Sequence, residues 1–170
     1  MYNVTDILDI AAAKYGKPLY WHIRRLVVSH DDAEDALQEC FVKVCTKAAS
    51  FRGEDEKSLA AWLYRIATNE ALQVLRRRSR LFQSLDSVSE ELSERVAAES
   101  APDADKASIL FQKALLRLPL RQRVAFTLRY YDGLPYDQIA RITGRSEGSL
   151  RTNYHYAVNT IKQYMEEHDI

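Results

Sequence analysis

The sequence predicts an all-α protein made of two small helical domains. Apolar residues recur at steps of three and four along most of the chain, and no stretch alternates apolar and polar residues over the length of a strand. The composition, 46% hydrophobic and 28% charged among 170 residues, is typical of a globular chain rather than a disordered one. The helical period fades between residues 83 and 108, where Ser, Ala and acidic residues dominate, although SEELSERVAA at 89–98 could form a transient helix. We therefore expect a helical domain at residues 1–82, a flexible acidic linker at 83–108 and a second helical domain at 109–170.

Two helices are expected at the start of the chain, at residues 4–15 and from about Leu19 to Val28. Thr5 is a candidate N-cap of the first helix. Gly16-Lys17-Pro18 is expected to end that helix, because proline offers no N–H to the preceding turn. The second helix directs four apolar residues toward a core: Leu19, Ile23, Leu26 and Val27.

Two longer helices follow. The third is expected to run from a cap at Asp31 or Asp32 to about Ala49, and the fourth from about Leu59 to Arg80. The third helix has an apolar stripe at helical spacing, formed by Ala33, Leu37, Cys40, Phe41, Val44 and Ala48. The fourth helix has a similar stripe, formed by Leu59, Trp62, Leu63, Ile66, Ala67, Val74 and Leu75.

The second domain is expected to begin with two helices, at about residues 107–117 and after Pro119. Proline suits the start of a helix because its missing N–H would have no partner there. The second of these helices is expected to end at Asp132-Gly133. Its inward residues are Val124, Leu128 and Tyr131.

The stretch from Pro135 to Met165 has the pattern of a helix-turn-helix. A short apolar helix is expected to end at Gly144, since glycine most easily adopts the left-handed conformation after a helix, and Ser146 is the expected N-cap of the next one. The longer helix has an apolar stripe formed by Leu150, Tyr154, Ala157, Val158, Ile161 and Met165. Its opposite face begins with Ser149, Arg151, Thr152, Asn153, His155 and Tyr156. Such a face can read DNA in the major groove, although these residues alone leave open an ordinary helical hairpin.

The zero formal net charge hides an asymmetry along the chain. Residues 83–108 contain 2 basic and 7 acidic residues, whereas the segments before and after them have net charges of +2 and +3. Two mildly basic domains therefore flank an acidic connector. No apolar run approaches the length of a membrane span, and the first residues lack the basic region of a signal peptide, so we expect a cytoplasmic protein.

No catalytic or metal-binding motif stands out. The phosphate-binding, nucleophile-elbow and zinc-protease patterns are all missing from the sequence. Cys40 and Cys45, five residues apart on a predicted helix, are interpreted as buried apolar residues in a reducing compartment. We therefore expect neither an enzyme nor a cofactor.

Two polar surfaces have more than one interpretation from the residues alone. The third helix exposes Glu34, Asp35, Gln38 and Glu39, which suits either a solvated face or a docking face for a basic protein. The fourth helix combines Trp62, Tyr64 and Asn69 with Arg65 and a terminal arginine cluster. Arginines can neutralise phosphates and aromatic rings can stack on unpaired bases. The same residues also suit a buried aromatic and a solvated helix end.

In this order, the segments resemble the extracytoplasmic-function (ECF) group of bacterial sigma-70-type RNA polymerase sigma factors. DDAEDALQECFVKV at 31–44 is similar to the family's polymerase-binding helix. Residues 51–80 are similar to the part that recognises and melts the −10 element, and residues 118–161 to the domain that reads the −35 element. The resemblance implies a factor that binds core RNA polymerase and directs it to promoter DNA. An anti-sigma factor is a further partner expected from the family.

The resemblance also implies roles for individual residues. The residues implied to bind RNA polymerase are Glu34, Asp35, Gln38 and Glu39. The residues implied to contact −10 DNA are Lys43, Phe51, Tyr64, Arg65, Asn69, Arg76 and Arg77. The residues implied to contact −35 DNA are Ser149, Arg151, Thr152 and His155. Asn153 and Tyr156 stand where family members often carry basic residues, which implies a weaker affinity for duplex.

Two other functions stay open on the sequence. One is a stand-alone helix-turn-helix regulator, which would dimerise on a palindromic site without polymerase. The other is a helical adaptor whose polar faces meet only solvent or protein.

Overall fold

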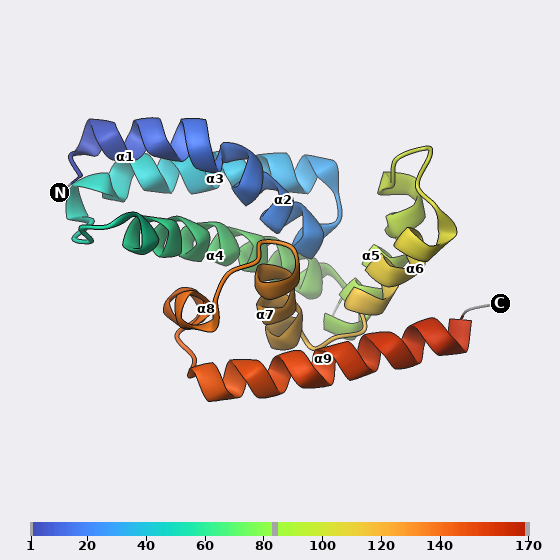
Figure 1. Cartoon of the computed structure of the whole chain (residues 1–170). Coiled ribbons are helices and arrows are strands. Elements are labelled where there is room, and N and C mark those ends of the chain that lie inside the picture. Colours follow the sequence, from blue (N-terminus) through green and yellow to red (C-terminus); the bar gives the residue numbers. More distant parts are fainter. Residues whose placement is uncertain (1, 83–84, 169–170) are drawn as a thin grey trace.

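The computed structural model describes residues 2–82 and 85–168, and within them the chain is helical without a strand (Figure 1). The α-helices are α1 (Val4–Ile10), α2 (Gly16–Val27), α3 (His30–Lys47), α4 (Glu56–Phe82), α5 (Leu85–Glu99), α6 (Lys106–Leu115), α7 (Leu120–Tyr130), α8 (Tyr136–Thr143) and α9 (Glu147–His168). A π-helical turn at Ala11–Tyr15 joins α1 to α2, and a 3-10 turn at Ala48–Ser50 follows α3. The expected all-α class is confirmed.

Helices α1 to α4 pack side by side and form what we call the first unit (Figure 1). The apolar stripes of α2, α3 and α4 meet in its centre. The fully buried side chains there include Leu19, Ile23, Leu26, Leu59, Leu63 and Leu75. Burial of these side chains contributes most of the stabilisation of the unit, roughly 1.5–3 kcal/mol for each large apolar side chain.

The expected helix end at Gly16-Lys17-Pro18 is wrong, because α2 begins at Gly16 and runs through the proline. The residue four positions before Pro18 is Lys14, which lies in the π-helical turn. A proline ring would clash with the carbonyl at that position in a regular helix. The widened turn accommodates this clash, and a single nearly continuous helical segment results.

Two expected helix caps are also wrong. Asn3, rather than Thr5, caps α1, because its side chain accepts the Asp6 N–H while the Asp6 carboxylate accepts the Asn3 N–H. Ser29, rather than an aspartate, caps α3 through the N–H of Asp32. In both cases more than one nearby polar residue could cap the helix. The residue that does so is the one whose extended backbone directly precedes the first helical residue.

The connector is more ordered than the flexible linker with at most a transient helix that the sequence indicated, because 15 of its residues form α5. Leu92 and Val96, one helical turn apart, are both buried in the main core. Arg78 on α4 contacts the Glu91 carboxylate at 3.2 Å, and Arg24 on α2 donates to the Glu99 carbonyl at 2.8 Å. Two apolar residues at helical spacing within an acidic segment are enough to hold it against α4.

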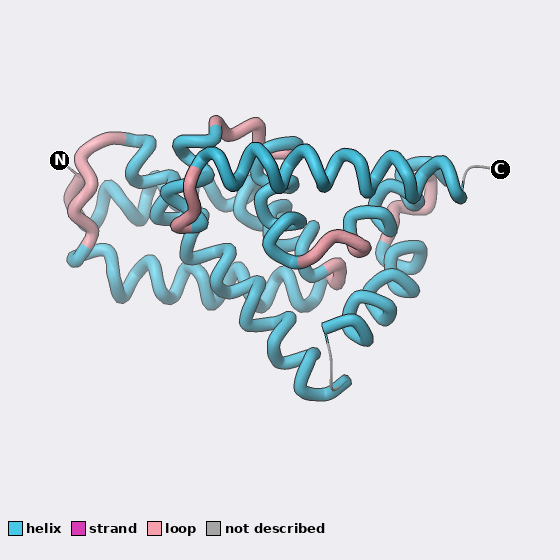
Figure 2. Tube along the Cα trace, turned by 90° about the horizontal axis from the view of Figure 1, so that it is seen from below, coloured by secondary structure: helices cyan, strands magenta, loops and turns pink. Residues whose placement is uncertain are grey.

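Helices α6 to α9 form the second unit, in which α9 lies along one side of the molecule (Figures 1 and 2). Gly144 is left-handed with φ 75°, and the Ser149 N–H donates to the Ser146 hydroxyl at 3.2 Å, so the expected turn and cap are confirmed. A small separate cluster fills this unit and contains Ala114, Leu115, Leu118, Phe126, Ala157 and Ile161.

The two units pack against each other through α7 and α8. Helix α7 contacts α2, and α8 contacts α4. Val124 and Leu128 of α7 and Ile139 of α8 belong to the same buried cluster as the core of the first unit. The Gln138 amide also donates to the Lys57 carbonyl at 2.5 Å. The units therefore share one hydrophobic core in this arrangement, which we call the closed arrangement.

Candidate polymerase and promoter interfaces

The acidic face of α3 is exposed as the sequence indicated. Buried Ala33, Ala36 and Cys40 hold the helix on the first unit and leave the polar residues outward. The four exposed residues of this face are Glu34, Asp35, Gln38 and Glu39. Val42 continues it by one turn and is 55% exposed, a large apolar side chain beside acidic ones. A charged face with an apolar centre is suited to a protein partner. Sequence periodicity had not singled out Val42.

The two cysteines of α3 differ in environment. Cys40 is buried as expected, and burial raises the pKa of its thiol to about 12, so the thiol stays protonated. Cys45 is exposed, and its expected burial is wrong. A step of five residues turns the helix well past one full turn, so the second side chain leaves the buried stripe. Among the described residues no cluster of His, Cys, Asp and Glu is placed to hold a metal ion.

Three side chains on α4 form an exposed stripe suited to nucleic acid. Arg65, Asn69 and Arg76 lie on one side of the helix over three turns and are all exposed, and Arg77 is exposed beside them. The opposite side of α4 carries buried Leu63, Ala67 and Leu75 and fixes the direction of the stripe.

Phe51 and Lys43 are engaged in contacts within the first unit. The Phe51 ring lies 5.1 Å from the ring of Trp62 and closes over Gly53. A Cβ at Gly53 would lie 2.5 Å from the Phe51 ring. Any other residue at position 53 would therefore displace this ring. The Lys43 ammonium pairs with the buried Glu70 carboxylate.

Tyr64 is the residue whose surroundings differ most from those of an open DNA-binding surface. It is 5% exposed and lies beneath the turn between α7 and α8. Its hydroxyl donates to the Asp132 carboxylate at 3.1 Å, and its ring meets the buried His22 ring edge-on. In the closed arrangement Tyr64 is an inter-unit contact.

Asp132 is the charged centre of that contact. Burial raises the pKa of its carboxyl to about 6, while Arg25 and the Tyr64 hydroxyl act in the opposite direction. Its second oxygen lies 3.8 Å from Nδ1 of His22, whose pKa burial lowers to about 3. The His22 ring is held by Thr68 at 2.8 Å. A neutral imidazole therefore faces a carboxyl that retains its proton at a higher pH than an exposed one.

The polar face at the start of α9 is exposed, and the sequence-predicted residues come together there. Arg151, Thr152 and His155 lie on one side of the first turns, with Ser149 at the helix start. Arg151 is held between the Glu147 carboxylate at 3.4 Å and the ring of Tyr136, 4.9 Å from its guanidinium. Asn159, 3.3 Å from the His155 ring, extends the face. Asn159 follows His155 by the same step of four residues that separates Arg151 from His155, so the sequence spacing could have identified it.

Comparison with known proteins assigns the chain to one family. The family model for sigma-70 region 2 matches residues 12–81, and the model for sigma-70 region 4 matches residues 108–164. The ECF RNA polymerase sigma-E factor of Escherichia coli K12 is 32% identical over 143 residues, which span 79% of this chain and 74% of that protein. The chain belongs to the ECF sigma factors.

Other relatives agree with this assignment. The RNA polymerase sigma-H factor of Pseudomonas aeruginosa is 29% identical and covers 93% of this chain and 86% of its own length. The sigma factor RpoE of Bartonella quintana, solved in complex with the anti-sigma factor NepR, has a TM-score of 0.67 and 30% identity over 91% of this chain and 93% of that one.

Membership in this family answers the main question that the sequence left open. The protein is a transcription initiation factor that binds core RNA polymerase and promoter DNA, and not a stand-alone helix-turn-helix regulator. The family is one of initiation factors rather than enzymes. In the described part of the chain, each helix is too short or too polar to cross a bilayer.

Proposed function

We propose that this ECF sigma factor divides its work between residues 1–82, which hold core polymerase and the melted −10 element, and residues 109–170, which read the −35 duplex. Residues 83–108 connect them. The protein acts in the cytoplasm beside the polymerase and uses no cofactor. The observation that carries the proposal is a pair of exposed polar stripes, on α4 and on α9, in a chain that both family models match.

Core polymerase binds the α3 face in this proposal. The acidic side chains Glu34, Asp35 and Glu39 supply charge complementarity to a basic surface, and Gln38 supplies hydrogen bonds. Val42 is the apolar contact at the centre of the interface, where burial contributes most to affinity.

The α4 stripe and the loop that follows Phe51 hold the melted −10 strand. Arg65, Arg76 and Arg77 neutralise phosphates, and Asn69 forms hydrogen bonds with an unpaired base. Lys43, paired with Glu70, and Phe51, packed on Trp62, lie beside α4 and contribute to the same site in this proposal, and Tyr64 joins them when the α7–α8 turn moves away. Promoter melting in this proposal therefore requires the closed arrangement to open.

The start of α9 reads the −35 element in the major groove. Arg151 donates to base edges, Thr152 and Ser149 contact phosphates or bases, and His155 extends the contact by one turn. The ring of Tyr136 and the carboxylate of Glu147 orient the Arg151 guanidinium for this role.

An anti-sigma factor is a further partner in this proposal. The Bartonella quintana relative was solved in complex with one, and its fold matches nearly the whole of this chain.

A transcription assay tests the polymerase face. Full-length chain is mixed with core RNA polymerase, and run-off transcripts from genomic fragments are counted. Glu39→Lys should weaken polymerase binding at least tenfold, because it reverses a charge inside the interface. Glu167→Lys, an equal charge change at an exposed site near the end of α9, is the control and should bind normally. Equal binding by the two variants would contradict the assigned face.

A second assay separates melted from duplex DNA. If Asn69 acted only in melting, Asn69→Ala holoenzyme would form fewer open complexes on a duplex promoter but a normal number on a template whose −10 region is already mismatched. Because we assign Asn69 to holding the strand, the loss should appear on both templates, while binding to a −35 duplex stays unchanged. An equal loss of −35 binding would rule out this assignment.

A further inference from the structure

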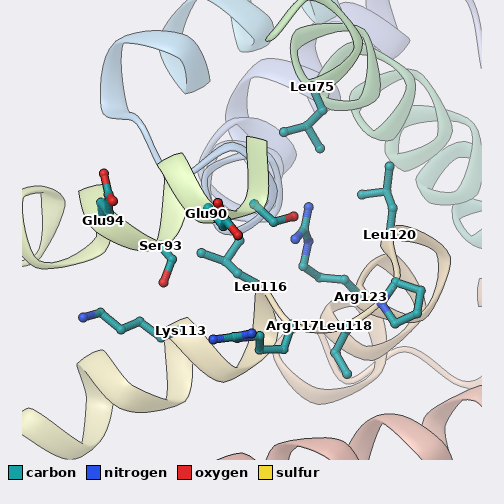
Figure 3. Close-up of a pocket in the computed structure, with 12 residues that line it drawn as sticks. Leu75, Glu90, Ser93, Glu94, Lys113, Leu116, Arg117, Leu118, Leu120 and Arg123 are labelled. Carbon is teal, nitrogen blue, oxygen red and sulfur yellow. The ribbon is translucent and has the colours of Figure 1, made fainter. Parts of the chain in front are cut away.

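A cavity of about 730 Å³ lies between the connector and the second unit, apart from the polymerase and promoter surfaces (Figure 3). One wall comes from α5, another from the corner between α6 and α7, and Leu75 of α4 closes the end. Cavities of roughly 300–1,000 Å³ are the usual size for small-molecule sites. The size and the composite wall make this cavity a candidate binding site.

Arg123 of α7 is the unusual residue of this cavity. Its side chain is 3% exposed, and Figure 3 shows it extending into the space between Leu116 and Leu120. Its Nε has no hydrogen-bond partner, and no ion pair joins Arg123 to a residue that the structure describes. Desolvation lowers the pKa of its guanidinium to about 10, which leaves it charged at neutral pH.

A buried, charged and unpaired guanidinium is costly for a folded protein, and such groups are ordinarily paired with an anion. We propose that the cavity binds a small organic anion, whose single carboxylate or phosphate group pairs with Arg123 and whose apolar body lies against Leu75 and Leu116. A planar guanidinium suits either head group, because both accept two parallel N–H hydrogen bonds.

The walls narrow the class of ligand. Leu75, Leu116 and Leu118 are buried apolar residues, and they favour a hydrocarbon or aromatic body over a sugar or a peptide backbone. The other charged lining residues balance one another, because Glu90 and Glu94 on α5 are matched by Lys113 and Arg117, and this leaves the single positive charge of buried Arg123. The cavity therefore fits one anionic group on an apolar body better than it fits a nucleotide.

Such a ligand would contact both sides of the closed arrangement, since its walls come from α4 and α5 as well as from α6 and α7. A molecule that binds only this arrangement stabilises it by mass action. The site is thus placed to oppose the opening of the two units. The inference is independent of the proposed DNA and polymerase contacts and can fail or hold without them.

Calorimetric titration of the full-length chain tests the site with three probes of one body: octanoate, octyl phosphate and octanol. Saturable binding of octanoate or octyl phosphate at 1:1, with octanol at least tenfold weaker, is expected. The two anions distinguish a carboxylate ligand from a phosphate ligand. If octanol bound as tightly as the anions, the cavity would be an apolar pocket in which Arg123 has no role, and the proposal would be overturned. The absence of saturable binding by both anions would overturn it as well.

Arg123→Met should weaken binding of the anions by at least about tenfold, because it removes their charged hydrogen-bond donor. Arg121→Met is the matched control, since Arg121 is exposed on the same helix and carries the same charge. Without any probe, Arg123→Met should melt at the same temperature as the original chain or higher, because it removes an unpaired buried charge. A lower melting temperature would show that Arg123 has a structural partner and would contradict the inference.

Glu90→Gln should change anion affinity in the opposite direction from Arg123→Met. Removing this negative charge from the α5 wall should strengthen binding of both anions severalfold and leave octanol unchanged. Weaker binding of the anions would show that Glu90 is itself a ligand contact and that the assigned charge preference of the cavity is wrong.

Discussion

The two proposed DNA surfaces differ in what their residues do in the free chain. On α9, Arg151, Thr152 and His155 are exposed and their contacts stay within their own helix or with Tyr136. In the first unit, Tyr64 is buried under the α7–α8 turn. The proposed −35 surface is therefore already exposed, whereas the proposed −10 surface, which includes Tyr64, is completed only by giving up contacts between the units.

The cause of this difference is the shared core. Leu128 of α7 and Ile139 of α8 are buried in the same cluster as the apolar centre of the first unit. Separating the units exposes these side chains to water, and each costs roughly 1.5–3 kcal/mol. If promoter binding separates the units as proposed, core polymerase or DNA supplies that free energy through contacts that only the separated units can make.

The largest expected effect tests whether α7 holds the units together. Leu128→Ala removes a side chain that is fully buried in the shared core, and it should lower the free energy of unfolding by about 2–5 kcal/mol. Denaturant unfolding should remain a single transition, because both units use this core. Val42→Ala, at an exposed site, should change stability by less than about 0.5 kcal/mol. Two separate transitions in the original chain would contradict a shared core.

The next effect uses pH to isolate the Asp132 contact. Burial raises the pKa of its carboxyl from 3.8 to about 6, so the folded state binds this proton more tightly than the unfolded state. The stabilisation is complete below about pH 4 and is lost as the pH rises through 6, by up to about 3 kcal/mol. The amide that Asp132→Asn introduces has no such proton. The unfolding free energy of the original chain minus that of Asp132→Asn should therefore decrease as the pH rises from about 4 to 7.

The comparison between the two proteins matters because His22 acts in the opposite direction. Its lowered pKa makes the folded state lose stability as the pH falls below about 6.5. His22 is present in both proteins, so the part of its contribution that does not depend on its contact with Asp132 cancels in the difference. A difference that stays constant between pH 4 and 7 would contradict the assigned burial of Asp132.

The sequence predicted the helices well and their arrangement only in part. Stripes at helical spacing gave the order of the helices and most of the core, and Gly144 and Ser146 gave the turn of the helix-turn-helix. The run of α2 through Pro18 was missed because the π-helical turn that accommodates it has no signal in residue type. Helix α5 was expected at most as a transient helix, because an acidic composition outweighed Leu92 and Val96, whose burial depends on a partner helix.

The sites show the same limit. Residue type and spacing identified exposed faces on α3, α4 and α9, because exposure of a polar stripe follows from burial of the opposite one. Packing of Tyr64 against Asp132 could not be predicted, since 68 residues separate them and their contact depends on how the units dock. Arg123 was missed as well, because an arginine beside apolar residues in a sequence gives no sign that it is buried without a partner.

A smaller effect is expected from the Tyr64 hydroxyl. Tyr64→Phe keeps the ring and removes the hydrogen bond to a buried carboxylate, which should destabilise the closed arrangement by about 1–2 kcal/mol. Fluorescent labels on the two units should then report a larger fraction of separated molecules. Tyr156→Phe, at a site that is 57% exposed, should leave that fraction unchanged. The same fraction for both variants would show that Tyr64 is not an inter-unit contact.

The smallest effect on stability is expected for Arg151 on α9, where we expect a clear effect on DNA binding. Arg151→Ala removes an exposed ion pair with Glu147 and should change the free energy of unfolding by less than about 0.5 kcal/mol. It should nevertheless weaken −35-dependent initiation by roughly 1–3 kcal/mol, because a base contact is lost. Lys106→Ala, an exposed cation at the start of α6, should change neither quantity. Unfolding and promoter titrations of the same three proteins give both numbers. If Arg151→Ala lowered stability as much as it lowered initiation, the α9 surface would also be tied to the fold, and the contrast with the first unit would disappear.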